Sequence, residues 1–217
     1  MIAFHIPDEL LVAYSAGHCD EATALVVATH LTLCPACRAL NGRLDAVGGN
    51  FLERMDAESV SDAALESVLS KLDAPAPKDA PPKPNAALAK VPRPIVAYLE
   101  GIGPAGELPW RRIMPGAEEL KLSLKKNGMP VRMTRTRGGF ILPKHTHAGS
   151  EMTLVLAGGF EDRGEHYEPG DVAICDQSVT HTIHFDPGDP CVALVVNDAR
   201  LIPKGPFSKV VSLFVDF

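Results

Sequence analysis

The residues of this chain that are best suited to chemistry form two groups, one on either side of a proline-rich stretch. The first group is His30, Cys34 and Cys37, in the spacing H-x3-C-x2-C. The second group is His145, His147, Glu151 and His181. Thiolate and imidazole together select Zn²⁺, whereas imidazole and carboxylate suit several divalent metals. Two ligand chemistries predict two metal sites in two modules.

The spacing of the first group can bring all three side chains to one metal ion. His30 and Cys34 are about one helical turn apart, and Cys37 follows in the first turn of the next expected helix. A structural Zn²⁺ site closes with a fourth protein ligand, for which His5 and His18 are the candidates. We favour His5, because its use would tie the start of the chain to the second and third helices.

The second group has a spacing that β-strands explain. Residues two apart on a strand face the same side, so His145 and His147 both point into a barrel. Glu151 then enters from just beyond a turn at 148–150, and His181 comes from a later strand. Three imidazoles and one carboxylate can hold Zn, Mn, Fe, Ni or Cu.

Composition favours folded modules. The chain has 217 residues, 46 % of them hydrophobic and 22 % charged, which suits two domains of ordinary size and argues against global disorder. Its longest apolar runs, such as 191–196, are far shorter than the roughly 20 residues of a membrane span. Asp8 and Glu9 argue against a signal peptide, so we expect a cytoplasmic protein without a membrane anchor.

Charge is unevenly distributed along the chain. Residues 1–73 hold four Lys or Arg against eleven Asp or Glu, a balance of −7, which leaves +1 of the total of −6 for the remainder. Nucleic acid binding depends on neutralising phosphates with Lys and Arg, so a zinc-finger DNA binder is disfavoured and no direct nucleic acid partner is expected. A basic protein surface is the better partner.

Five cysteines, an odd number, are better explained as metal ligands, core residues or redox thiols than as a disulfide framework. Cys19 has no partner in the metal pattern and is expected to be a small buried residue. Cys175 and Cys191 lie in expected strands, where core packing is the first interpretation and oxidation the alternative. His166 and His184 lie outside the motifs, and we expect both on the surface or in a strand.

Four helices are expected in the N-terminal module, over 8–16, 21–33, 35–55 and 61–72. Gly17 stops the first helix and Asp20 caps the second. Pro35 ends the second helix, because the residue before proline leaves the helical region, and it begins the third. Acidic side chains fall between the apolar positions, so these helices have one wet and one dry face.

The stretch 74–94, APAPKDAPPKPNAALAKVPRP, is dense in proline and poor in large apolar groups. We expect a semi-rigid linker, so that the modules on either side can move relative to each other. Short β-type runs separated by Gly and Pro follow it, at 110–114, 120–124, 131–136, 152–156, 172–175, 181–185 and 192–195. Such a series predicts an all-β sandwich or barrel.

The second group of ligands lies in a motif that resembles the first motif of the cupin superfamily. Its residues are Gly139, His145, His147, Glu151 and Gly158, with the spacing G-x5-H-x-H-x3-E-x6-G. A weaker second motif runs from Gly170 to His181, with Asp176 and Ser178 where Pro and Gly are usual and Phe185 in place of the usual Asn. The resemblance implies a double-stranded β-helix, or jelly-roll, barrel with a metal site.

The first seventy residues resemble the zinc-binding anti-sigma domain of ChrR-type anti-sigma factors. The segments HIPDELLVAYSAG, DEATALVVATHLTLCPAC and RALNGRLDAVGG carry this resemblance. It implies a Zn²⁺ ion held by His5, His30, Cys34 and Cys37. It also implies a helical domain that binds an extracytoplasmic-function type sigma factor and keeps it from RNA polymerase.

The same family pairs this domain with a C-terminal cupin that carries a matching His, His, Glu, His set. The resemblance therefore implies stress sensing, with singlet oxygen or organic peroxide acting on the cupin. The expected organisation is a zinc-binding anti-sigma helical domain at 1–73, a proline-rich linker at 74–94 and a cupin domain at 95–217. We expect a regulator and not an enzyme. The alternative is a metal-dependent cupin oxygenase with a regulatory N-terminal domain.

Overall fold

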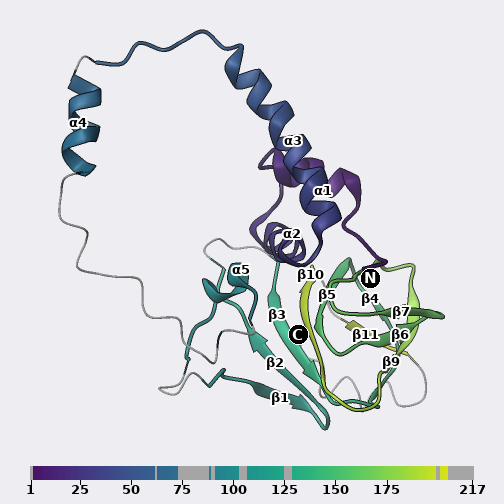
Figure 1. The fold of residues 1–217 in the computed structure, drawn as a ribbon. Helices are drawn as coiled ribbons and strands as arrows, with labels where there is room; N and C mark the ends of the chain where they lie inside the picture. Colours follow the sequence, from purple (N-terminus) through teal and green to yellow (C-terminus); the bar gives the residue numbers. More distant parts are fainter. Residues whose placement is uncertain are drawn as a thin grey trace.

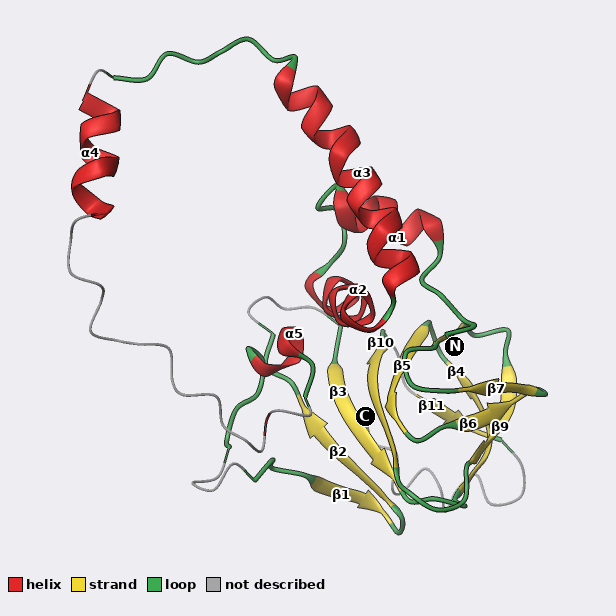
Figure 2. Ribbon diagram, viewed as in Figure 1, coloured by secondary structure: helices red, strands yellow, loops and turns green. Residues whose placement is uncertain are grey.

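A computed structural model places a group of helices against one side of a β-barrel (Figure 1; Figure 2). It describes residues 2–61, 63–72, 88, 91–102, 107–124, 129–198 and 201–204. The expected fold class is confirmed, because an α-helical N-terminal part is followed by a barrel built only of antiparallel strands.

The helices are α1 (Asp8–Ser15), α2 (Glu21–Leu33), α3 (Pro35–Glu53), α4 (Ala63–Leu72) and the short α5 (Arg93–Val96). Asp20 caps α2 as predicted, since its side chain accepts hydrogen bonds from the backbone N–H groups of Ala22 and Thr23. Gly17 follows α1 with a φ of 71°, a conformation that favours glycine. Cys34 is extended, so α2 ends and α3 begins at the Cys34–Pro35 bond.

Among the described residues, no single helix is long and apolar enough to cross a membrane. The helices Glu21–Leu33 and Pro35–Leu52 reach the necessary length and apolar composition only when they are taken together, and the chain bends by 117° between them.

The barrel consists of two antiparallel sheets. The strands are β1 (Arg111–Met114), β2 (Ala117–Lys121), β3 (Val131–Thr136), β4 (Ile141–His147), β5 (Glu151–Ala157), β6 (Phe160–Asp162), β7 (Glu165–Tyr167), β8 (Val172–Cys175), β9 (Thr180–Phe185), β10 (Cys191–Asn197) and β11 (Leu201–Pro203). One sheet has the order β1-β2-β3-β10-β5-β8 and the other β11-β4-β9-β6-β7. β6, β7 and β11 were not predicted, because three residues are too few to show an alternating pattern.

Both faces of β10, a central strand of the six-stranded sheet, are buried. On β10, Ala193 and Val195 line a cavity inside the barrel. Leu194 and Val196 point the other way, into the core that the sheet shares with the helices. Helix α2 contacts β10, β5 and α5, and it thereby covers the part of the outer face that β10 and β5 form (Figure 1).

The expectation that the two modules can move relative to each other is wrong for this structure, in which they pack together. Side chains of α2 such as Val26 and of the barrel such as Leu154 belong to one hydrophobic core, and both are fully buried. Ile95 of α5, at the start of the expected cupin domain, is also buried in this core. Separating the modules would expose that apolar surface to water, which is unfavourable. Most of the predicted linker, 74–94, lies outside the described residues.

Candidate metal centres

The four residues of the first predicted site come together where the helices meet the barrel. Nδ1 of His5 lies 3.3 Å from Sγ of Cys34 and 3.5 Å from Sγ of Cys37. The donor atoms of these residues and of His30 all lie within 4.8 Å of one another. Ligands bound to one tetrahedral Zn²⁺ ion would be roughly 3.3–3.8 Å apart, so this group has suitable geometry. His18, the alternative fourth ligand, is not in the group.

Local structure explains this convergence. His30 lies in the last turn of α2, and Cys34 follows directly as the residue between the two helices. Cys34 is also the N-cap of α3, where its Sγ accepts a hydrogen bond from the backbone N–H of Cys37 at 3.4 Å. Pro35 forces the break in the helix that lets both cysteines face the same point. His5 arrives from the extended segment that precedes α1.

Burial shifts the pKa of two members of this first group, His30 and Cys37. His30 is fully buried, its Nε2 has no hydrogen-bond partner, and burial lowers its pKa. Burial also raises the pKa of the Cys37 thiol to about 11. A neutral imidazole is ready to bind a metal, whereas Cys37 must lose a proton as the metal binds.

Three histidines of the second predicted site also come together, inside the barrel. His145 and His147 lie on β4, and His181 lies on β9, where it is the register partner of His145. Nε2 of His147 is 3.1 Å from Nε2 of His181, and the donor atoms of all three rings lie within 4.8 Å of one another. All three side chains are buried.

Burial and hydrogen bonding prepare these rings as metal ligands. Burial lowers the pKa of His147, and it lowers the pKa of His145 to about 4, so both rings are neutral near pH 7. Nδ1 of His145 donates to the carbonyl oxygen of Pro143 at 2.9 Å, which leaves Nε2 free and without a partner. Neutral imidazole is the form that binds metals.

Glu151 lies at the edge of the histidine cluster and not within it. Its Oε2 is 3.6 Å from Nδ1 of His147, and its side chain lines the same cavity. The Thr153 hydroxyl donates to Oε1 at 3.4 Å. The predicted set of four ligands is therefore present in one place, with three histidines close together and the carboxylate beside them.

Sequence reasoning missed Asp162, a buried carboxylate on β6. Its Oδ2 lies 2.9 Å from Nδ1 of His181, and together with Cys175 the two residues form another close group of possible ligands. Metal-binding histidines commonly direct their second nitrogen at such a carboxylate, which fixes the ring and its tautomer. The sequence offers one indication of its burial. Asp162 is two residues after the buried Phe160, so on a strand both side chains lie on the same side.

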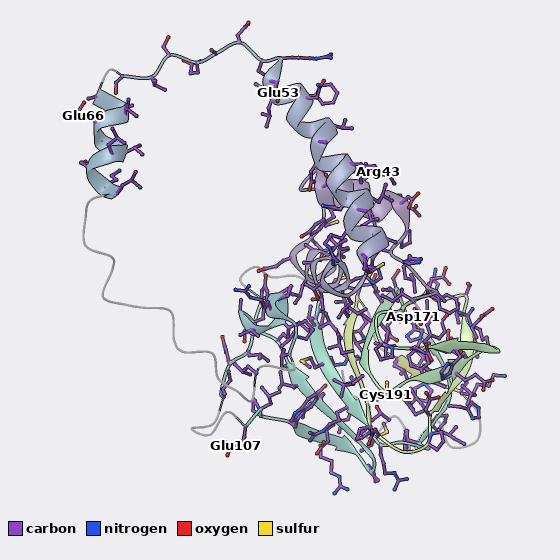
Figure 3. The ribbon with its side chains drawn as sticks, viewed as in Figure 1. Arg43, Glu53, Glu66, Glu107, Asp171 and Cys191 are labelled. Atoms are coloured by element: carbon purple, nitrogen blue, oxygen red, sulfur yellow. The ribbon has the colours of Figure 1, made fainter. Side chains whose placement is uncertain are left out.

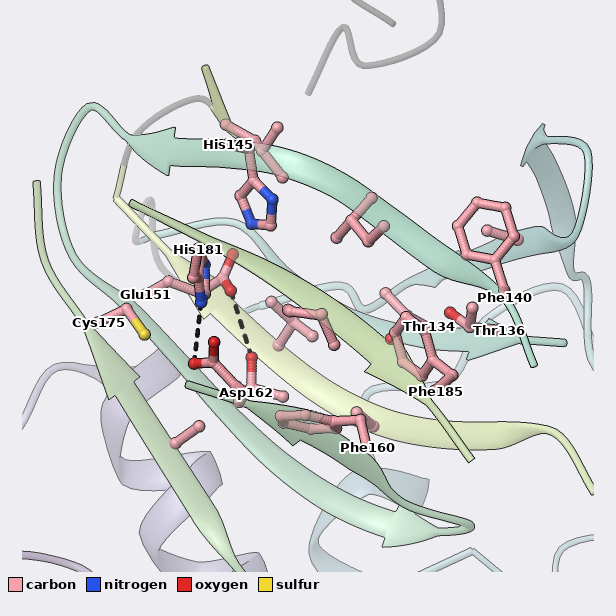
Figure 4. A pocket seen from close by; sticks show the side chains of 18 of the residues that line it. Thr134, Thr136, Phe140, His145, Glu151, Phe160, Asp162, Cys175, His181 and Phe185 are labelled. Atoms are coloured by element: carbon pink, nitrogen blue, oxygen red, sulfur yellow. Dashed lines mark hydrogen bonds and ion pairs between the residues drawn. The ribbon is translucent and has the colours of Figure 1, made fainter. Parts of the chain in front are cut away.

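The histidine cluster opens onto a cavity of about 110 Å³ between the two sheets (Figure 4). His145, His181, Glu151, Asp162 and Cys175 lie at one end of it. Aromatic side chains line it further along, namely Phe140, Phe160 and Phe185. The lining therefore changes from imidazole, carboxylate and thiol groups to aromatic rings within one cavity.

Two departures from the cupin motif have structural explanations. Oδ1 of Asp176 accepts hydrogen bonds from the backbone N–H and the hydroxyl of Ser178, which forms a tight turn in place of the usual Pro and Gly. Phe185 replaces the usual Asn and packs against Phe140 and Phe160, with ring centroids 6.4 and 6.0 Å apart. The second motif thus keeps its turn and makes the cavity more apolar.

The remaining cysteines and histidines have ordinary environments, with one exception. Cys19 is only half-buried, and Cys191 packs in the barrel core, where burial raises its pKa to about 12. His166 and His184 are exposed on strands, as predicted. The exception is Cys175, which lines the cavity beside the metal-ligating groups, and burial raises its pKa to about 11.

Comparisons with known proteins agree with this arrangement. The family model for the ChrR Cupin-like domain matches residues 102–199. A curated protein of Cereibacter sphaeroides, Anti-sigma-E factor ChrR, is 38 % identical over 200 residues, which is 92 % of this chain and 92 % of that protein.

Solved structures give a similar result. The crystal structure of Rhodobacter sphaeroides SigE in complex with the anti-sigma ChrR matches with a TM-score of 0.73 and 36 % identity, over 91 % of this chain and 100 % of that chain. An RmlC-like cupin protein from Ralstonia eutropha covers 51 % of this chain and 74 % of its own at 14 % identity, and its TM-score of 0.42 is too low to support an argument.

The two clusters predict two metal ions that can be removed separately. In the full chain, Cys34→Ala with Cys37→Ala should lose one ion per chain, because only two ligands of the first cluster remain. His145→Ala with His147→Ala should lose the other. Elemental analysis of the purified proteins measures this, with Cys19→Ala as the control that keeps both ions. Loss of the same ion in both double variants would contradict two sites.

The contact between Asp162 and His181 predicts a supporting role for the carboxylate. Asp162→Asn should weaken metal binding in the barrel by about 10–100-fold, because His181 loses the charge that fixes its ring. Competition with a chelator on the full chain measures the affinity. Asp186→Asn, a change at a half-buried carboxylate outside the cluster, is the control. Equal affinity of Asp162→Asn and the unchanged chain would show that Asp162 plays no part.

Proposed function

Because this chain belongs to the ChrR family of anti-sigma factors, we propose that it binds and inhibits a sigma factor through its helical module. SigE is the sigma factor in the solved complex of the similar ChrR. For this chain the proposed partner is an extracytoplasmic-function type sigma factor in the cytoplasm. The observation that carries the proposal is an apolar surface on α3 and α4 that the described part of the chain leaves uncovered.

Helix α4 is the clearest part of this surface. It has ten residues, none of them buried, and it stands apart from the rest of the fold (Figure 1). Its large apolar side chains are exposed at the spacing i, i+3, i+4, i+7, which makes one stripe: Leu65, Val68, Leu69 and Leu72. A helix this short is marginal alone in water, so such a stripe favours a helix that binds in a groove of a partner.

Helix α3 continues the same kind of surface. Leu40 and Leu44, in its first half, pack against the hydrophobic core. Further along, Val47 and Phe51 are 57 % and 67 % exposed, and Met55, just beyond the end of the helix, is 68 % exposed. The apolar stripe thus extends from the fold into solvent, and exposed apolar surface of this extent marks an interaction site.

Charge supports a basic partner. Residues 1–73 carry a balance of −7, and acidic side chains such as Glu53 and Glu66 lie on the two exposed helices (Figure 3). Opposite charge speeds the approach of a partner and helps to orient it, while the apolar stripe supplies most of the affinity.

Within this proposal the first metal centre is a structural Zn²⁺ site. His5, His30, Cys34 and Cys37 would join the N-terminal segment, α2 and α3, and thus set the direction in which α3 extends. The second centre would hold a divalent metal, Zn, Mn, Fe, Ni or Cu, at His145, His147, Glu151 and His181. The proposed domains are 1–73 and 95–217 with a linker at 74–94, and the second is proposed to sense oxidative stress.

The exposed stripe predicts which residues bind the sigma factor. Phe51→Asp combined with Leu69→Asp should weaken binding at least 100-fold, since burying one such side chain contributes about 1.5–3 kcal/mol. Both side chains are exposed, so the fold should be unaffected. Calorimetry with the sigma factor encoded near this gene measures the affinity. Ile202→Asp, an exposed apolar residue on the barrel, is the control, and unchanged binding of the double variant would refute this surface.

A second candidate, a cupin oxygenase, is favoured by the cavity beside the histidine cluster. Treating the sigma-factor complex with an organic hydroperoxide, or exposing it to singlet oxygen, distinguishes a sensor from an enzyme. A sensor should release the sigma factor after about one equivalent of hydroperoxide per chain. The variant His145→Ala with His147→Ala should abolish this release. Consumption of many equivalents without release would identify an enzyme instead.

A further inference from the structure

The loop between β7 and β8, residues 168–171, contacts the segment that carries His5. Oδ1 of Asp171 accepts hydrogen bonds from the backbone N–H groups of Ala3 at 2.7 Å and Phe4 at 2.9 Å. Its Oδ2 accepts a third from the backbone N–H of Glu168 at 2.8 Å. Asp171 lies at the end of the barrel that faces the helices (Figure 3). One carboxylate therefore fixes both the loop and the start of the chain.

The neighbouring residue, Gly170, reaches the first metal centre directly. Nδ1 of His30 donates a hydrogen bond to the carbonyl oxygen of Gly170 at 2.8 Å. This bond places the proton on Nδ1 and leaves Nε2, which is buried and unpartnered, to face the cluster of His5, Cys34 and Cys37. In metal sites the acceptor for the second histidine nitrogen orients the ligand and tunes its basicity. Here that acceptor comes from the barrel.

The fit between the loop and the N-terminal segment is close. Gly170 has a φ of 100°, and a Cβ atom added to it would lie 2.5 Å from Cδ1 of Ile2. His30 is fully buried and Asp171 is only 1 % exposed, so water cannot readily replace either hydrogen bond. Backbone pairing continues the contact, since the N–H of Val172 donates to the carbonyl oxygen of Phe4 at 3.0 Å.

We propose that residues 168–171 are the positioning element of the first metal centre. Asp171 holds the segment that brings His5 to the cluster, and the Gly170 carbonyl orients His30. The barrel thereby completes a metal site whose ligands all belong to the helical module. This inference rests on the proposed function only for the identity of the ion, Zn²⁺.

The same element leads into the cavity of the barrel by two routes. Strand β8 begins directly after the loop, and its residues Ala173 and Cys175 line the cavity. Phe4 stacks on Tyr167 with ring centroids 4.4 Å apart, and Tyr167 stacks on Phe160, a cavity residue, at 4.9 Å. Packed residues therefore connect the two candidate centres without passing through the proline-rich stretch.

The test uses the full chain loaded with Zn²⁺ and compares Asp171→Ala and Asp171→Asn with the unchanged protein. Transfer of zinc from the first centre to a chelator should become about 10–100-fold faster in Asp171→Ala, the range found when groups that support metal ligands are removed. Asp171→Asn should have a smaller effect, because it keeps one of the two acceptor oxygens. Asp186→Asn should release zinc at the unchanged rate.

Two further measurements separate positioning from general destabilisation. Hydrogen exchange at the Ala3 and Phe4 amides should accelerate in Asp171→Ala, while the metal in the barrel stays bound. The NMR signal of the His30 Nδ1 proton should shift or broaden. If zinc transfer and amide exchange were both unchanged in either variant, the inference would be overturned. If Asp171→Ala does not fold, the same measurements are made on Asp171→Asn. No sigma factor is involved, so a failure here is distinct from a failure to bind one.

Discussion

The outer face of the six-stranded sheet is the constraint on which the rest of the molecule depends. On β10 this face carries the apolar side chains of Leu194 and Val196. Because exposing them to water is unfavourable, another element has to cover them. Helix α2 covers them. Since the last turn of α2 carries His30 and leads into Cys34, this packing also brings the candidate ligands of the first metal centre to the end of the barrel.

Features that depend on a few neighbouring residues could be predicted from the sequence. The Asp20 cap, the break at Pro35 and the H-x3-C-x2-C spacing each act within one or two helical turns, so reading them requires no knowledge of the tertiary fold. The pair His145 and His147 is similar, since alternation along one strand puts both side chains on the same side. Within each cluster, the members that are close in sequence follow these local rules, whereas His5 and His181 join from more distant parts of the chain.

Features that depend on contacts between distant parts of the chain could not be predicted in this way. Asp162 meets His181 only because β6 pairs with β9, and a three-residue strand carries too little pattern to reveal that. The sequence does contain one indication that the helices pack against the barrel. The run 191–196 is apolar at every position and does not alternate, which is typical of a strand covered on both faces. The proline-rich stretch suggested independent modules, but a linker says nothing about whether the surfaces it joins are complementary.

The hydrogen bond from His30 to the carbonyl oxygen of Gly170 joins a candidate ligand of the first centre directly to the barrel. If a ligand or oxidant in the barrel alters the affinity of the first centre for its ion, then binding of that ion must alter the affinity of the barrel by the same factor. Zinc would then be more than a fixed part of the fold. The amount of zinc available to the cell would set how readily the barrel responds, and a partner that prefers one state of the helices would adjust both equilibria together.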